Sequence, residues 1–179
     1  MTLFANSGVA WPRHEPETKD AGAKSLEAAS GLFRILGTLE ADSQTAQPME
    51  FEIARCAESL NEAAQIYTRV AESLAGELVS PLTPSEFELA AVPRYERRYI
   101  DDDFYESPFH YRGPVRIGEL YRDLAHRLSR LAGAVRMLNT PARNFDLAPQ
   151  VFEILKLWDS VSTLARVIAT LGRRSPQGG

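Results

Sequence analysis

Residues 49–74 read MEFEIARCAESLNEAAQIYTRVAESL. Apolar residues recur here at alternating steps of four and three, and this spacing keeps their side chains on one face of an α-helix. Charged residues occupy the opposite face, so the stretch predicts an amphipathic helix with one buried face. We expect it to begin at Pro48 and to end near Val79, before Ser80-Pro81. The apolar positions are Met49, Ile53, Cys56, Leu60, Ala63, Tyr67, Val70 and Leu74.

Three further stretches show the same periodicity, at about residues 20–39, 113–139 and 149–171. Gly172 is expected to end the last of these helices, because glycine is frequent just past helix C-termini. In the first stretch the core stripe is expected to comprise Leu26, Ala29, Phe33 and Leu36, widened by Leu32, Ile35 and Leu39.

A short additional helix is predicted between the second and third long helices. Thr83-Pro84-Ser85-Glu86 has the capping-box pattern that starts helices, and Pro93 limits the helix to about two turns. No strand-like alternation of useful length competes with the helical pattern. Long helices with such stripes pack at shallow angles. The sequence therefore predicts an all-α fold, an up-down four-helix bundle with a short extra helix and a long connection between helices two and three.

The chain of 179 residues is expected to form a single domain. We predict a flexible N-terminal arm over residues 1–20, a helical bundle over 21–172 and a disordered tail over 173–179. The single cysteine, Cys56, allows no intramolecular disulfide and favours a reducing, cytoplasmic setting. No run of about 18 apolar residues and no secretory signal pattern is present, so we expect no membrane partner.

Charge is divided unevenly along the chain. Residues 1–93 carry a balance of −8 and residues 94–179 a balance of +4. Such a division suits binding to an acidic partner or to a second copy of the chain, although the two halves can also neutralise each other inside one bundle. The 17 arginines and 3 lysines favour bidentate contacts, and a GC-rich bacterial genome gives the same bias.

Residues 94–112, RYERRYIDDDFYESPFHYR, form an unusually long connection that is rich in aromatic and charged residues. One interpretation is a recognition surface, because tyrosine and arginine dominate binding hot spots. The other is a lid that packs its aromatic rings on one end of the bundle. The residues assigned to partner binding are Arg94, Tyr95, Arg97, Arg98, Tyr99, Phe104, Tyr105 and Tyr111.

The same segment holds the oxygen ligands that hard metals prefer, in Asp101-Asp102-Asp103 and Glu106, followed by His110. Their spacing matches no established calcium loop, and the glycine that an EF-hand turn requires is missing. We therefore predict a solvated acidic turn, and no metal or other cofactor.

His126 lies about 200° around its helix from Leu124, a core position, and should face solvent or a flank. The string Ala125-His126-Arg127-Leu128 resembles the A-H-x-L core of histidine phosphotransfer domains, and its last three residues are similar to the start of some histidine-kinase dimerisation helices. Ser129-Arg130 stands where the phosphotransfer domains have Lys-Gly. The resemblance implies phosphotransfer through His126, with Arg122, Arg127 and Arg130 around the phosphoryl group.

The arginines of the third helix are also suited to the phosphates of a nucleic acid. The alternative is pairing with the acidic faces of helices one and two, and a pI near 5.5 favours this alternative. Phosphate loops and the common metalloprotease and hydrolase motifs are missing from the sequence. Cys56 lies on a core stripe, where a thiol acts as a small apolar group.

These patterns lead to one main prediction and two alternatives. The main prediction is a non-enzymatic, cytoplasmic, bacterial protein that binds a protein partner or associates with itself as an accessory subunit. The alternatives are histidine phosphotransfer through His126 and nucleic-acid binding through the third helix.

Overall fold

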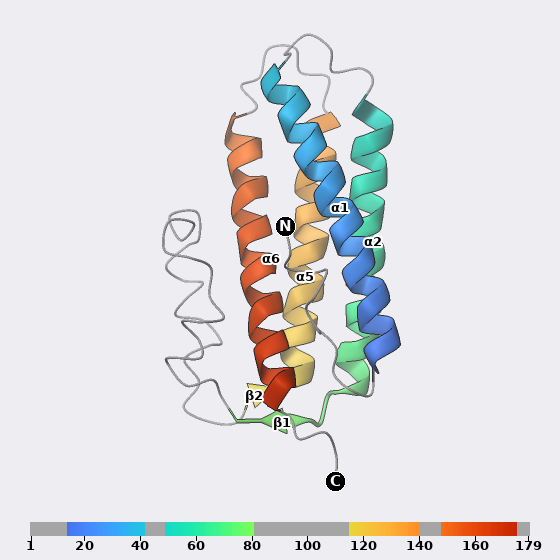
Figure 1. Cartoon of the computed structure of the whole chain (residues 1–179), viewed down its shortest axis with the longest axis vertical. Coiled ribbons are helices and arrows are strands. Elements are labelled where there is room, and N and C mark those ends of the chain that lie inside the picture. Colours follow the sequence, from blue (N-terminus) through green and yellow to red (C-terminus); the bar gives the residue numbers. More distant parts are fainter. Residues whose placement is uncertain (1–13, 42–48, 81–114, 140–147, 175–179) are drawn as a thin grey trace.

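A computed structural model describes residues 14–41, 49–80, 115–139 and 148–174 of the chain. Most of them lie in four α-helices that run side by side along the long axis (Figure 1). The predicted all-α class is thereby confirmed. Within the described ranges the helices are α1 (Glu15–Ala41), α2 (Glu50–Ser73), α5 (Ile117–Arg136) and α6 (Ala148–Arg174), and the short 3-10 helix η5 (Met137–Asn139) extends α5.

The helices share one apolar core. α2 packs against both α1 and α5, and α5 packs in turn against α6. Every apolar position predicted for α2 is buried, and so is the apolar face of α5. None of the described helices is long and apolar enough to span a membrane. The largest side chains with almost no exposure include Tyr67, Tyr121, Leu32, Ile35, Leu60, Leu124, Leu128, Leu131, Ile154 and Leu164.

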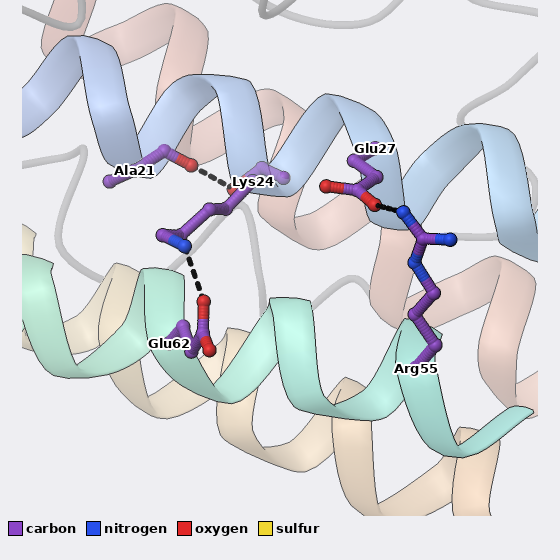
Figure 2. A network of polar contacts seen from close by, with 6 residues as sticks. Ala21, Lys24, Glu27, Arg55 and Glu62 are labelled. Atoms are coloured by element: carbon purple, nitrogen blue, oxygen red, sulfur yellow. Dashed lines mark hydrogen bonds and ion pairs between the residues drawn. The ribbon is translucent and has the colours of Figure 1, made fainter.

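Two ion pairs join α1 to α2 across their solvent-facing edge (Figure 2). Lys24 donates to Glu62, and Arg55 donates to Glu27. The hydrogen bond to Glu62 raises the pKa of Lys24 above its ordinary value. These contacts lie at the surface, where an ion pair contributes at most about 1 kcal/mol. They fix the register of the two helices more than they stabilise the fold.

The first helix differs from the prediction in its start and in one core position. α1 begins at Glu15, so residues 15–20 belong to the helix and not to an arm. Phe33 was predicted in the core, but it is 45% exposed. Leu32 and Ile35, which were predicted to widen the stripe, do point into the core. Phe33 follows Leu32 directly and is therefore turned by about 100° around the helix from it. Its ring meets Trp158 of α6 edge-on, with centroids 6.5 Å apart.

The end of the second helix was also predicted wrongly. α2 ends at Ser73 and not near Val79, because the chain turns through residues 74–76 and then forms the strand β1 (Leu78–Val79). β1 pairs antiparallel with β2 (Val115–Arg116), with Val79 opposite Val115. The amide of Ile117 donates to the Glu77 carbonyl at 3.2 Å. Strands of two residues are too short to produce a recognisable alternation in the sequence.

Two further helix boundaries differ from the prediction. The third helix begins at Ile117, later than predicted, because the two residues before it form β2. α6 continues past Gly172 to Arg174, since glycine disfavours a helix without forbidding it. At the start of α5, Gly118 lies directly against the carbonyl groups that end α2. A Cβ atom on Gly118 would lie 2.7 Å from the Ala71 oxygen, so α2 and α5 approach there at backbone distance.

Candidate functional site

His126 lies on the outward face of α5 and is exposed, as its predicted position required. Arg122 and Arg130 stand one helical turn before and after it, and both are exposed. Among the described residues the imidazole has no hydrogen-bond or ion-pair partner. Gly133, two turns further along, has open space where its Cβ would be. The ring is therefore accessible and has cations on both sides, which suits contact with an anionic group.

Arg127 was predicted to contact the same phosphoryl group, but it lies in a different environment. Its guanidinium binds Asp123 through two nitrogens, at 3.1 and 2.7 Å. A third nitrogen donates to the Ser160 hydroxyl at 3.1 Å and to the Ser160 carbonyl at 3.4 Å. The side chain is only 11% exposed. Arg127 thus fastens α5 to α6, because one step from His126 turns it towards the neighbouring helix.

Pairing with acidic faces on the first two helices was the alternative to phosphate contacts for the other arginines of this region, and the described residues do not show it. Arg116 of β2 lies 3.8 Å from Glu119 of α5, and Arg130 lies 3.7 Å from Glu153 of α6. Among the described residues no ion pair joins α5 to α1 or α2. Arg122 and Arg136 stay exposed. These arginines do not reach α1 or α2 because their side chains point outward or towards α6.

The tyrosine- and arginine-rich segment lies outside the described residues, together with the predicted extra helix, the acidic turn and residues 175–179 of the predicted tail, whose first two residues instead belong to α6. This applies to Arg94, Tyr95, Arg97, Arg98, Tyr99, Phe104, Tyr105 and Tyr111. The structure does show where the connection that contains this segment, residues 80–114, leaves and rejoins the described bundle. The β1–β2 pair brings residues 79 and 115 together beside the C-terminus of α2 and the N-terminus of α5.

Two stacked tyrosines occupy the core between α2 and α5. The rings of Tyr67 and Tyr121 are 5.8 Å apart and tilted by 29°. Burial raises the pKa of Tyr67, and Tyr121 adds to the shift. The Tyr67 hydroxyl is buried without a hydrogen-bond partner, as are the hydroxyls of Ser162 and Thr163. Tyr67 is therefore a neutral packing residue, consistent with its predicted place on the core stripe; the pairing with Tyr121 gave no signal in the sequence.

Cys56 is buried as predicted, and its thiol donates to the Ala28 carbonyl at 3.2 Å. Burial raises the pKa of this thiol to about 11. A protonated thiol is a poor nucleophile and a poor metal ligand. The described part of the chain also contains no group of three or more His, Cys, Asp or Glu residues that could hold a metal ion.

No model of a known protein family matches this chain, and no curated protein and no solved structure matches it. Its function is therefore inferred from the geometry of its own residues.

Proposed function

We propose that this chain is a non-enzymatic protein that binds other proteins, as a self-associating or accessory subunit built on an up-down four-helix bundle. The observation that carries the proposal is the β1–β2 pair. It brings together, at one point of a helical core, the two ends of the connection over residues 80–114, which contains the tyrosine- and arginine-rich segment. Binding loops are commonly presented in this way by a rigid scaffold.

The up-down arrangement is supported by contacts between successive helices. Lys24 and Glu27 follow one another along α1, and their ion-pair partners on α2, Glu62 and Arg55, come in the reverse order. On α5, Arg127 and Arg130 meet Ser160 and Glu153 of α6, again in reverse order.

α2 and α5 are likewise joined by the antiparallel strand pair. Antiparallel neighbours in chain order are the signature of an up-down bundle.

The recognition chemistry is supplied by the segment itself. Six aromatic residues and four arginines lie within residues 94–112. Tyrosine and arginine combine large contact areas with hydrogen bonds, and they are enriched where interfaces gain most of their free energy. A partner surface that offers carboxylates and apolar pockets would complement this composition.

Replacement of residues 81–114 by a short Gly/Ser linker tests this function. Because residues 79 and 115 are paired neighbours, a few residues can close the gap without disturbing the helices. We expect the helical circular dichroism and the cooperative melting of the full chain to be retained. Other proteins captured by the full chain should no longer be captured.

A point variant keeps the segment but removes its aromatic contacts, namely Tyr95→Ala with Tyr99→Ala. It should weaken the same interactions while the helical fold is retained. The proposal is refuted if the linker variant still captures every protein that the full chain captures. It is also refuted if the full chain is a strict monomer that captures nothing.

Phosphotransfer through His126 is a second candidate, favoured by the exposed imidazole between Arg122 and Arg130. In such a transfer an imidazole nitrogen attacks the phosphorus of an aspartyl phosphate on a receiver protein. The P–N bond forms as the P–O bond to the carboxylate breaks, and the imidazole releases its proton to water. The two arginines would balance the charge of the phosphoryl oxygens.

Incubation with a phosphorylated receiver protein tests this candidate. Acid-labile phosphate should appear on the wild-type chain and not on His126→Ala, and Arg122→Ala should reduce it. Arg127→Ala serves as the matched control, because that arginine is bound to Asp123 and Ser160. Absence of labile phosphate on the wild type would eliminate the candidate.

Nucleic-acid binding stays a weaker alternative. Of the five arginines from Arg116 to Arg136, three are within ion-pair distance of carboxylates, namely Arg116, Arg127 and Arg130. A titration at low and high salt would detect it, because phosphate contacts weaken steeply as salt is raised.

A further inference from the structure

Neighbouring helices of this bundle carry opposite charges that do not meet inside the molecule. On α2 the exposed residues Glu58, Gln65 and Glu72 recur every seven residues. On α5 the exposed residues Arg122, Ser129 and Arg136 recur at the same spacing. A step of seven returns to nearly the same side of a helix. We name these two lines the acidic row and the basic row.

The charged side chains of both rows lack partners. Among the described residues, Glu58 and Glu72 form no ion pair, and neither do Arg122 and Arg136. Arg55 and Glu62 of α2 are paired with α1, whereas Glu52 and Arg69 are exposed and form no ion pair among the described residues. The rows are distinctive because they combine exposure, regular spacing and opposite sign.

The two rows lie on the same side of the molecule and overlap along its length. α2 uses other positions to contact α1, and α5 uses Arg127 and Arg130 to contact α6, so both rows lie on the side turned away from α1 and α6. The stacked pair Tyr67–Tyr121 sets the register between the helices. Counted in equal and opposite steps from this pair, Arg122 lies between the levels of Glu58 and Glu72, and Arg136 lies level with Glu52, beyond Glu58.

Most of the side chains between the charges of this face are small or short, and no heavy atom lies within 4 Å of where a Cβ on Gly133 would be. Phe51, seven residues before Glu58, adds one large apolar side chain that is 75% exposed. Arg69 lies beside the acidic row on the side away from α5, and the row keeps a net negative charge. The small exposed residues are Ala54, Thr68, Ser129 and Gly133, with the half-buried Asn61 among them.

We propose that this α2–α5 face is the surface through which two copies of the chain associate. A two-fold axis parallel to the helices places α2 of one copy over α5 of the other. Each acidic row then faces the basic row of the other copy, and the dimer contains this contact twice. A two-fold axis perpendicular to the helices would instead place α2 over α2 and α5 over α5, so that charges of the same sign would face each other. The inference rests on the proposed self-associating function and names the surface that performs it.

The chemistry of the face sets the strength of the association. Its charges are exposed and its apolar area is small, so the dimer should be of modest affinity and should dissociate as salt is raised. Complementary charge of this kind determines orientation and partner choice more than affinity.

The experiment measures the dimer dissociation constant of the full chain by sedimentation equilibrium at low and high salt. The double variant Arg122→Glu/Arg136→Glu makes both rows acidic, and Glu58→Arg/Glu72→Arg makes both basic. Each variant alone should weaken the dimer by about tenfold or more. An equimolar mixture of the two should recover a dimer, because the attractive pairs are restored between unlike chains.

The matched control is Arg116→Glu/Arg130→Glu, which changes the net charge equally at two arginines outside the basic row, one paired with Glu119 and the other with Glu153 of α6. Its dimer should persist. The proposed face is refuted if the wild type stays monomeric at low salt, if the row variants associate as wild type does, or if the control dissociates equally. The linker variant changes residues 81–114 and leaves the α2–α5 face intact, so the two proposals are tested separately. Capture of a different protein through residues 81–114 would still support the proposed function even if the α2–α5 face did not associate.

Discussion

Replacement of Gly118 by alanine tests the closest contact between two helices of this protein. An alanine Cβ would stand 2.7 Å from the Ala71 oxygen and 3.0 Å from the Leu74 oxygen. Carbon and oxygen atoms ordinarily approach to about 3.3 Å or more. Both oxygens belong to backbone at the end of α2, so neither can rotate away, and α5 must shift by about half an ångström.

The cost follows from two opposing effects. Forcing an extra carbon into a packed contact costs about 1–3 kcal/mol, and a rigid backbone neighbour places this site at the upper end. Alanine is a better helix former than glycine by about 1 kcal/mol, which offsets part of the cost. We expect Gly118→Ala to lower the free energy of unfolding by about 2 kcal/mol. In a chain of this size the melting temperature should fall by about 4–8 °C.

Gly133→Ala is the matched control on the same helix. No atom lies within 4 Å of its Cβ position, so only the gain in helix propensity remains. This variant should gain up to about 1 kcal/mol, which separates the two variants by about 3 kcal/mol. Urea unfolding followed by circular dichroism measures both values. If Gly118→Ala is as stable as the wild type, α5 does not rest on the end of α2 and the described contact is wrong.

Three other predictions concern the core. Leu128→Ala and Leu60→Ala should each lose about 2–5 kcal/mol of stability in the same assay, because both side chains are buried, and losses below about 1 kcal/mol at both would contradict a shared core. Tyr67→Phe should leave the stability unchanged or raise it by about 1 kcal/mol, since its hydroxyl is buried without a partner, and a marked loss would reveal a hydrogen bond to that oxygen. The Cys56 thiol has a pKa of about 11 in the folded chain against an ordinary value of 9.0. The protonated thiol therefore contributes fully to the free energy of unfolding below pH 9.0. This contribution is lost as the pH rises towards about 11, because the thiol of the unfolded chain loses its proton at a lower pH than the buried thiol does. Cys56→Ala should flatten that alkaline decline, and an unchanged pH profile would show that another group causes it.

The candidate site was predictable only in part. The exposure of His126 followed from its angle to Leu124 on one helix. The role of Arg127 did not follow, because only the packing of α6 shows that Asp123 and Ser160 take up its guanidinium. The acidic and basic rows are visible in the sequence at a spacing of seven. That they share one side of the molecule depends on how α2 and α5 are rotated against each other.

The sequence by itself determined the helices and the side chains that each one buries, as the stripe of α2 and the buried place of Cys56 illustrate. The physical reason is local, since the helical repeat fixes which residues share a face before any neighbour is present. The tertiary structure decided the rest: where α2 stops for β1 to pair with β2, why Phe33 leaves the core for Trp158, and which glycine lets two helices touch. Each of these outcomes is set by atoms far away in the chain, and a periodic pattern contains no information about them.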